Sequence, residues 1–330
     1  MRRIVTALCG LGLFAGTLAN TLAGGAEMAP AQANISGLKA KFIDAGGVKT
    51  RYYDEGNGEP MVLVHGTGFS GVASANTWSL NIPGLSARFH VYAPDKLASG
   101  LTDNPQSDDD LNIRGEVKHL YAFVKALGLT RFHLVGQSRG GGAAFLFAVA
   151  HPEMVKTLVI VDSATIAPVA GDDRDKRRAR LFANCPKEEN DRGDQFRCEQ
   201  SALYYDPKPV TDDFVASAAY MWRQPKAKET ARRMTREVRR SGELVSSEMV
   251  HNAYHRILTE DVLNMPVLIY WAKNDPSVLP EQAYALYNIV AESNPRAWLL
   301  FTNRGGHFHY REHPEEWNRN VINFVTAWGN

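Results

Sequence analysis

Cysteine is scarce in this sequence. Its 330 residues contain three cysteines, and no group of cysteine and histidine residues has the spacing of a metal site. The glycine fingerprint of a dinucleotide-binding turn is absent as well. The sequence therefore predicts neither a metal ion nor an organic cofactor.

An excess of charge of one sign is also lacking. The chain has 37 basic and 36 acidic residues, which give a formal net charge of +1, and the two signs are mixed along it. This balance gives no indication of a nucleic-acid or anionic-membrane partner. There is no obvious internal repeat, and a hydrophobic share of 44% suffices for one large domain, or for a core domain with an insertion. The oligomeric state stays open.

The N-terminus differs in kind from the rest of the chain. Two arginines follow Met1, and an apolar stretch and then small residues follow them. This pattern predicts a secretory signal peptide over residues 1–26, and residues 27–36 are expected to form a flexible lead-in. An uncleaved membrane anchor is the alternative, but polar residues interrupt the apolar run, so we expect no stable membrane insertion. The predicted location is secreted or periplasmic.

Removal of the signal peptide would leave two cysteines, Cys185 and Cys198, on either side of a short polar segment. An isolated pair in an oxidising compartment often forms a disulfide. The predicted export therefore favours a Cys185–Cys198 bridge over two free thiols.

Apolar strands alternate with helical patterns through most of the chain. The expected strands are residues 49–56, 60–64, 89–95, 131–138, 157–164, 264–275 and 296–302, and the expected helices are 114–127, 139–151 and 314–328. Such alternation predicts a mostly parallel sheet with helices on both faces.

One long segment interrupts this alternation. Residues 165–263 are rich in charge and contain helix-like stretches without a strong strand pattern. We therefore expect an α/β core over 37–164 and 264–330, with 165–263 inserted into it as a helical cap, or lid.

A serine stands where an apolar strand gives way to a helix. Gly136, Gln137, Ser138, Arg139 and Gly140 fit the G-x-S-x-G pattern of a nucleophile turn. Because neighbouring backbone must approach closely at such a turn, side chains at the two glycine positions would clash. Ser138 is therefore the predicted nucleophile.

An oxyanion hole requires two backbone N–H donors near that serine. The N–H of Arg139, directly after the nucleophile, is one candidate. The loop after the strand at 60–64 supplies the other, the N–H of Thr67, with Gly68 as the fallback. His65 lies at the strand end under this loop, where a structural role is the simpler interpretation.

A nucleophilic serine needs a base, and the base needs an orienting acid. His307 follows two glycines after the last expected strand and is preferred to His309 and His313, which lie where the loop runs into a helix. Asp275 ends another expected strand and is the predicted acid, with Asp162 as the runner-up.

These motifs resemble the α/β-hydrolase superfamily over nearly all of the mature chain, and within it most resemble the meta-cleavage-product hydrolases, which break carbon–carbon bonds. "HGTGFSG" is similar to their oxyanion loop, and "APDKLASGLTDNP" and "GHFHYREHPEEWNRNVINF" to two further segments. Lidded serine esterases and lactonases share much of this pattern. The resemblance implies the triad order Ser138, Asp275, His307 and a cap inserted after the sixth core strand. The family usually has asparagine, methionine and tryptophan where this chain has Gln137, Arg139 and Phe308.

The predicted function is that of an exported serine hydrolase. Its substrate would be a small carbonyl compound (an ester, a lactone or a diketo acid cleaved at a carbon–carbon bond), whose acyl group passes to water. A small-molecule binder that keeps the triad but barely turns over is the alternative. The candidate substrate-binding residues are Arg139, Gly68, Phe69, Phe308 and Trp222.

The side chain of Arg139 has two interpretations. Its guanidinium could pair with a substrate carboxylate, or it could pair with a protein acid and brace the turn. A buried charge needs a partner in either case.

Overall fold

The structure is a computed structural model that describes residues 27–168, 174–187 and 191–328. Within these residues the chain forms one eight-stranded sheet with the order β1-β2-β4-β3-β5-β6-β7-β8. The strands are β1 (Lys41–Asp44), β2 (Lys49–Glu55), β3 (Glu59–Val64), β4 (Phe89–Pro94), β5 (Phe132–Gln137), β6 (Val155–Val161), β7 (Val267–Ala272) and β8 (Ala297–Thr302). β1 is additional to the strands expected from the sequence.

The sheet is mostly parallel, as predicted. β1 pairs with β2, and β2 with β4, in antiparallel fashion, and all other pairs are parallel. The parallel strands therefore end on one edge, where β3, β5, β6 and β7 deliver the loops that carry Thr67, Ser138, Asp162 and Asp275.

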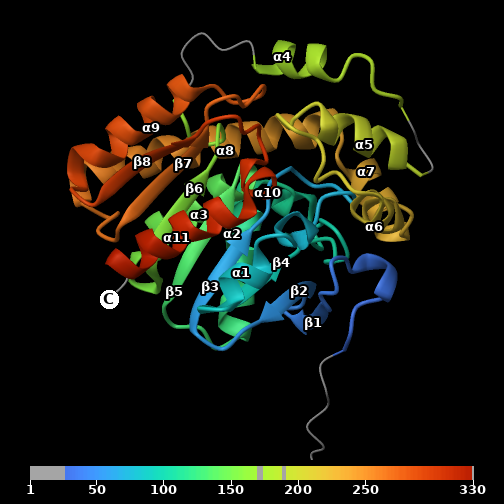
Figure 1. Ribbon diagram of the computed structural model, residues 1–330, viewed down its shortest axis with the longest axis horizontal. Coiled ribbons are helices and arrows are strands. Elements are labelled where there is room, and N and C mark those ends of the chain that lie inside the picture. Colours follow the sequence, from blue (N-terminus) through green and yellow to red (C-terminus); the bar gives the residue numbers. More distant parts are fainter. Residues whose placement is uncertain (1–26, 169–173, 188–190, 329–330) are drawn as a thin grey trace, which may run out of the picture.

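Helices cover both faces of this sheet (Figure 1). The helices of the described part of the chain, including those of the inserted segment, are α1 (Ile82–Ser86), α2 (Ile113–Ala126), α3 (Arg139–Ala150), α4 (Arg174–Leu181), α5 (Gly193–Ser201), α6 (Asp212–Trp222), α7 (Pro225–Arg233), α8 (Arg236–Glu260), α9 (Pro280–Ser293), α10 (His309–Glu312) and α11 (Pro314–Trp328). Short 3-10 turns are η1 (Ala31–Ala33), η2 (Ala75–Trp78), η3 (Asp108–Asp110) and η4 (Pro152–Met154). None of the helices in the described part of the chain is both long and apolar enough to span a bilayer.

The side chains of the central strands alternate between the two faces of the sheet, and the protein therefore has a hydrophobic core on each face. In β3, Val62 and Val64 pack with α2, α3 and α9 on one face, whereas Met61 and Leu63 pack with α1 and α11 on the other. Because successive side chains in a strand point to opposite faces, a strand that is apolar throughout must be covered on both sides.

The inserted segment forms helices α4 to α8 between β6 and β7. Figure 1 shows α5, α6 and α7 together at one side of the molecule, away from α9 and α11, which flank the sheet. The end of α8 behaves differently, because Ala253 and Ile257 are buried in the core cluster of α2 and α3. The last part of the predicted cap thus packs as a core helix.

The expectation of a flexible lead-in over 27–36 does not hold in this structure. Met28 forms a β-bridge with Lys41, and Ala33 and Ile35 are buried. The carbonyl of Ala33 accepts a 2.7 Å hydrogen bond from the buried Arg51 guanidinium. A buried cation needs acceptors, and the lead-in backbone supplies one. The predicted signal peptide, residues 1–26, lies outside the described residues.

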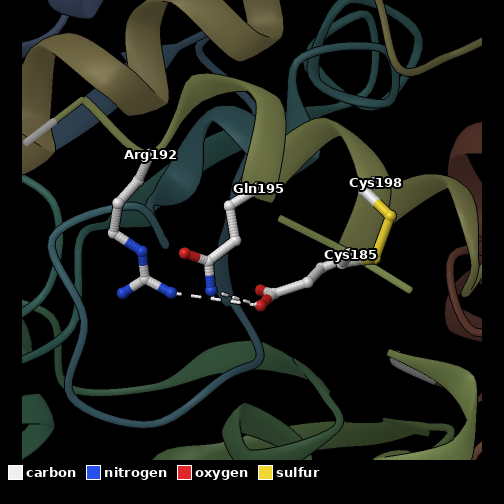
Figure 2. The surroundings of a disulfide bond; sticks show 5 residues. Cys185, Arg192, Gln195 and Cys198 are labelled. Atoms are coloured by element: carbon white, nitrogen blue, oxygen red, sulfur yellow. Dashed lines mark hydrogen bonds and ion pairs between the residues drawn. A yellow bond between two sulfur atoms is a disulfide. The ribbon is translucent and has the colours of Figure 1, made fainter. Parts of the chain in front are cut away.

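A disulfide joins Cys185 to Cys198 in the cap, as predicted (Figure 2). The two Cα atoms are 5.5 Å apart, and the cysteines are separated by 13 positions in the sequence. Cys198 lies in α5, and Cys185 follows α4. In the same helix Gln195 donates a 2.7 Å hydrogen bond to the carboxylate of Glu199. The disulfide therefore links the segment after α4 to α5, a helix that the Gln195–Glu199 hydrogen bond also stabilises.

Removal of this bridge should destabilise the cap. We expect the double substitution Cys185→Ala and Cys198→Ala to lower the free energy of unfolding by roughly 2–3 kcal/mol, because the closed loop restricts the unfolded chain. Urea denaturation followed by circular dichroism measures the change. Dithiothreitol should shift the wild type to a similar extent and leave the double variant unaffected. An unchanged wild-type midpoint after full reduction would contradict the expectation.

Candidate active site

Ser138 occupies a strained turn between β5 and α3. Its φ angle is +53°, in the left-handed region, and its N–H donates a 2.7 Å hydrogen bond to the carbonyl of Val161. A Cβ atom at Gly136 would lie 2.4 Å from the carbonyl oxygen of Gly140, and one at Gly140 would lie 2.3 Å from that of His65. The glycines are therefore required by close backbone approach, as the sequence pattern predicts.

Asp275 and His307 come together across the edge of the sheet. The Oδ2 atom of Asp275 lies 2.5 Å from Nδ1 of His307. Its other oxygen accepts hydrogen bonds from the N–H and hydroxyl of Ser277 and from the N–H of Val278, at 2.7, 2.8 and 2.9 Å. Both oxygens of the acid are thus engaged, and the imidazole is held in one orientation.

The loop of His307 is fixed from two sides. Its N–H donates a 2.8 Å hydrogen bond to the carbonyl of Leu203, in the cap. Its carbonyl accepts a 3.1 Å hydrogen bond from the side chain of Gln137, the residue before Ser138. The cap and the nucleophile turn therefore both position this histidine loop.

Ser138 and His307 line one cavity of about 350 Å³. No direct hydrogen bond joins the serine hydroxyl to the imidazole in the described structure. Such bonds are often long without a substrate and shorten when one binds.

The other two candidate histidines lie elsewhere. His309 is fully buried, with Nδ1 2.9 Å from the hydroxyl of Thr302, and burial lowers the pKa of His309 to about 3. His313 faces the carbonyl of Arg304, 2.9 Å away. The structure therefore places neither of them with Ser138.

Asp162, the runner-up acid, lies beside the predicted pair. Ligand atoms of Asp162, Asp275 and His307 are within 4.8 Å of one another. One Asp162 oxygen accepts the N–H of Ala272 at 2.8 Å, and the other lies 3.1 Å from Nε2 of His309. Burial, and then the charge of Asp275, raise the pKa of Asp162 well above its usual range. Asp275, and not Asp162, makes the short contact with the imidazole of His307.

That same cluster of Asp162, Asp275 and His307 is the one group in the described residues with metal-ligand geometry. Within it, a hydrogen bond joins Oδ2 of Asp275 to Nδ1 of His307. The arrangement therefore has the chemistry of an acid–imidazole pair with a second carboxyl group beside it.

The predicted oxyanion donors are free at the cavity. Thr67, Gly68 and Arg139 all line the cavity that holds Ser138. Within the described part of the chain, their backbone N–H groups have no hydrogen-bond acceptor. Unpaired N–H groups beside a nucleophile can receive an oxyanion.

Arg139 pairs with a protein acid. Its Nε atom lies 3.0 and 3.2 Å from the two carboxylate oxygens of Glu116, and its guanidinium lies 5.3 Å from the ring centre of Phe69. Glu116 also contacts the ammonium group of Lys96 at 3.3 Å. This pair is the one that the brace interpretation of Arg139 expects, and about a quarter of the side chain (26%) stays exposed.

Four of the five candidate substrate-binding residues line the cavities around Ser138. Gly68 and Arg139 line both the cavity of about 350 Å³ and a larger one of about 750 Å³ beneath α8; Phe69 lines the larger one and Phe308 the smaller. Trp222 is a correction, because it packs inside the cap with Lys228 4.2 Å from its ring centre and lines neither cavity in the described structure. Its helical spacing reflects the packing of the cap.

Sequence reasoning did not identify several residues of the site. They are Lys96 and Glu116 beneath the oxyanion loop, and Arg178, Leu203, Ser277 and Val278 along the cavity. One signal was available, because Glu116 lies on the buried side of α2, four residues before the buried Leu120. A buried carboxylate requires partners, so its position in that apolar pattern indicates an ion pair.

The fold and the site define a class of protein. Residues 59–314 match the family described as alpha/beta hydrolase fold, so the chain belongs to this family. It is a hydrolase of the α/β fold, and its relatives include carbon–carbon bond hydrolases and lipases. The predicted fold class, and the prediction that the chain is an enzyme of this class, are confirmed.

Individual relatives narrow the comparison. The chain is 27% identical, over 87% of its length and 90% of the relative's, to the 2-hydroxy-6-oxo-6-(2'-aminophenyl)hexa-2,4-dienoic acid hydrolase of Metapseudomonas resinovorans. It is also 27% identical to Lipase 1 of Psychrobacter immobilis, over 82% of the chain and 80% of that lipase. A solved meta-cleavage product hydrolase from Pseudomonas fluorescens IP01 matches with a TM-score of 0.68 and 28% identity, over 87% of this chain and 97% of its own.

The acid beside His307 should control its protonation. Burial lowers the pKa of His307, but the charge and hydrogen bond of Asp275 outweigh burial and hold that pKa above its ordinary value. We therefore expect Asp275→Asn to shift the pKa of His307 downward, as measured by NMR titration of the imidazole. Asp162→Asn is the matched control and should shift the same pKa less. A larger shift in the control would make Asp162 the partner of His307.

Proposed function

We propose that the chain is a serine hydrolase that transfers the acyl group of a small carbonyl substrate to water. The observation that carries the proposal is the 2.5 Å contact between Asp275 and His307, at a cavity that Ser138 also lines. Asp275 holds the imidazole in the tautomer whose Nε2 can accept a proton.

The reaction follows from these positions. Ser138 Oγ attacks the carbonyl carbon as His307 takes the hydroxyl proton, and the N–H groups of Arg139 and Thr67 donate to the oxyanion. His307 then protonates the leaving group, and an acyl-enzyme forms. Water attacks the acyl carbon as His307 takes one of its protons. The bond from the acyl carbon to Ser138 Oγ then breaks, His307 returns the proton to Oγ, and the carboxylic acid product leaves.

The bond that is cleaved is either an ester or lactone bond or a carbon–carbon bond. Hydrolysis of an ester or lactone needs only the steps above, and the similarity to a lipase supports it. Cleavage of a carbon–carbon bond in a diketo acid is favoured by the similarity to dienoic acid hydrolases. In that case the site must first protonate a carbon to give a ketone. A panel of short p-nitrophenyl esters, lactones and a ring-fission diketo acid distinguishes the two.

We also propose that the protein works outside the cytoplasm, secreted or in the periplasm. The signal-peptide pattern of residues 1–26 and the Cys185–Cys198 disulfide support this, because structural disulfides persist in oxidising compartments. Fractionation of cells that express the full chain, followed by N-terminal sequencing of the mature protein, tests both export and cleavage.

Replacement of the nucleophile should abolish turnover. We expect Ser138→Ala to lower kcat on an accepted ester by about 10⁴-fold or more, and to abolish covalent labelling by a fluorophosphonate probe. Ser247→Ala, which removes a hydroxyl of α8 that lines the larger cavity, is the control and should keep labelling. If the folded wild type fails to label, the slow-turnover binder is favoured instead. Near-normal turnover in Ser138→Ala would refute the proposal.

The role of the Arg139 side chain can be separated from that of its N–H. Because its Nε atom is held by Glu116, we expect Arg139→Met to lower kcat/KM to a similar extent on p-nitrophenyl butyrate and on mono-p-nitrophenyl succinate. The two esters match in length and differ in the carboxylate. A loss confined to the acidic ester would instead assign Arg139 to a substrate carboxylate.

A further inference from the structure

Three charged side chains lie together beneath the oxyanion loop. Lys96 follows β4, Glu116 lies in α2, and Arg139 begins α3. The Lys96 and Glu116 side chains are almost completely buried, at 4% and 1% exposed. Burying these charges costs desolvation free energy that an apolar side chain at the same position would not cost. Their presence therefore indicates a specific role.

The first peptide of the loop is oriented through His65. The backbone N–H of Lys96 donates a 3.0 Å hydrogen bond to Nε2 of His65. Nδ1 therefore carries the proton, and it donates to the carbonyl of Gly66 at 2.8 Å. Because the peptide is trans, fixing the Gly66 carbonyl points the N–H of Thr67 in the opposite direction. His65 thus has the structural role expected from its position in the sequence.

The second peptide is oriented by the Lys96 side chain. Its ammonium group donates a 2.6 Å hydrogen bond to the carbonyl of Thr67. By the same trans geometry, this bond fixes the direction of the Gly68 N–H. Thr67 has a φ of +63°, an unfavourable conformation for a β-branched residue, so the loop needs such support. Lys96 therefore supports both candidate donors of the loop, the Thr67 N–H through its backbone N–H and His65, and the Gly68 N–H through its ammonium group.

Glu116 connects this loop to the other half of the oxyanion hole. It accepts from Lys96 at 3.3 Å and from Arg139 at 3.0 Å. The backbone N–H of Arg139 is the donor that follows the nucleophile. One buried carboxylate thus joins the two chain segments that supply the oxyanion donors.

We propose that Lys96, Glu116 and Arg139 form a positioning network that sets the spacing and direction of the oxyanion donors. Lys96 and Glu116 are positioning residues, since they act through Thr67, Gly68 and Arg139. The inference rests on the proposed serine-hydrolase function and adds residues to it. The network should serve the transition state more than the bound substrate, because the negative oxygen develops only during attack.

The test compares two lysines that both bind backbone carbonyls. Lys96→Met removes the ammonium group from the network. Lys226→Met, the matched control in α7, removes one that donates to the carbonyls of Ser99 and Gly100 at 3.2 and 3.1 Å, outside the oxyanion loop. Melting temperatures report the loss of stability in each variant.

The readouts are ester hydrolysis and the rate constant for fluorophosphonate labelling. In labelling, the bond from Ser138 Oγ to phosphorus forms, fluoride leaves, and the phosphoryl oxygen takes the oxyanion position. We expect Lys96→Met to lower kcat and the labelling rate by about 10- to 100-fold with KM within about twofold. Lys226→Met should keep both rates within about threefold of wild type, even where its melting temperature falls.

Glu116→Gln provides a second variant with the volume conserved and the charge removed. It should lower the labelling rate by about tenfold or more, so the proposal stays testable where Lys96→Met does not fold. Wild-type labelling rates in the folded Lys96 and Glu116 variants, or equal losses in Lys226→Met, would overturn the network. Ser138→Ala distinguishes failure of the proposed function from failure of the network. If Ser138→Ala is still labelled, the proposed function is refuted. If Ser138→Ala is not labelled but Lys96→Met has wild-type kinetics, only the network is refuted.

Discussion

The close backbone approach at the turn between β5 and α3 is the constraint on which the rest of the site depends. The turn brings the carbonyl of His65 against Gly140 and leaves Ser138 with a positive φ angle. This contact sets the nucleophile beside the loop that follows β3. Because two backbones meet without side chains between them, the oxyanion donors of both segments reach the same cavity.

Hydrogen bonds and ion pairs connect this turn to the chain segments around it. Gln137, next to the nucleophile, donates to the carbonyl of His307, and the cap residue Leu203 accepts the N–H of the same histidine. On the other side, Glu116 binds Arg139 and Lys96. The nucleophile turn is therefore connected to the histidine loop, the cap and the oxyanion loop.

Residues identified from local motifs are found where the sequence predicted them. Ser138 follows from its glycines and from the strand and helix around it, and Asp275 and His307 follow from their places after strands. Trp222 was a candidate as part of an aromatic pocket, but it packs inside the cap beside Lys228 and lines neither cavity. Strand β1 was missed although its partner β2 is the next strand along the chain: its four residues are only partly buried or exposed, so they carry no clear apolar pattern. The packed lead-in was missed because its place depends on the buried Arg51, which contacts Ala33 from a separate strand.

The sequence by itself determined the chemistry available to this protein. It predicted the order of the candidate nucleophile, acid and base, the mostly parallel sheet, the inserted segment and the pairing of two cysteines. Those features follow from short-range patterns in which each residue's neighbours limit its conformation. Only the tertiary structure shows that Asp275, and not Asp162, makes the short contact with His307, and that Glu116 is the protein acid beside Arg139. The partner of a buried charge is set by distance and orientation. In this protein the partners lie on chain segments that are not adjacent in the sequence, so only the folded structure brings them together.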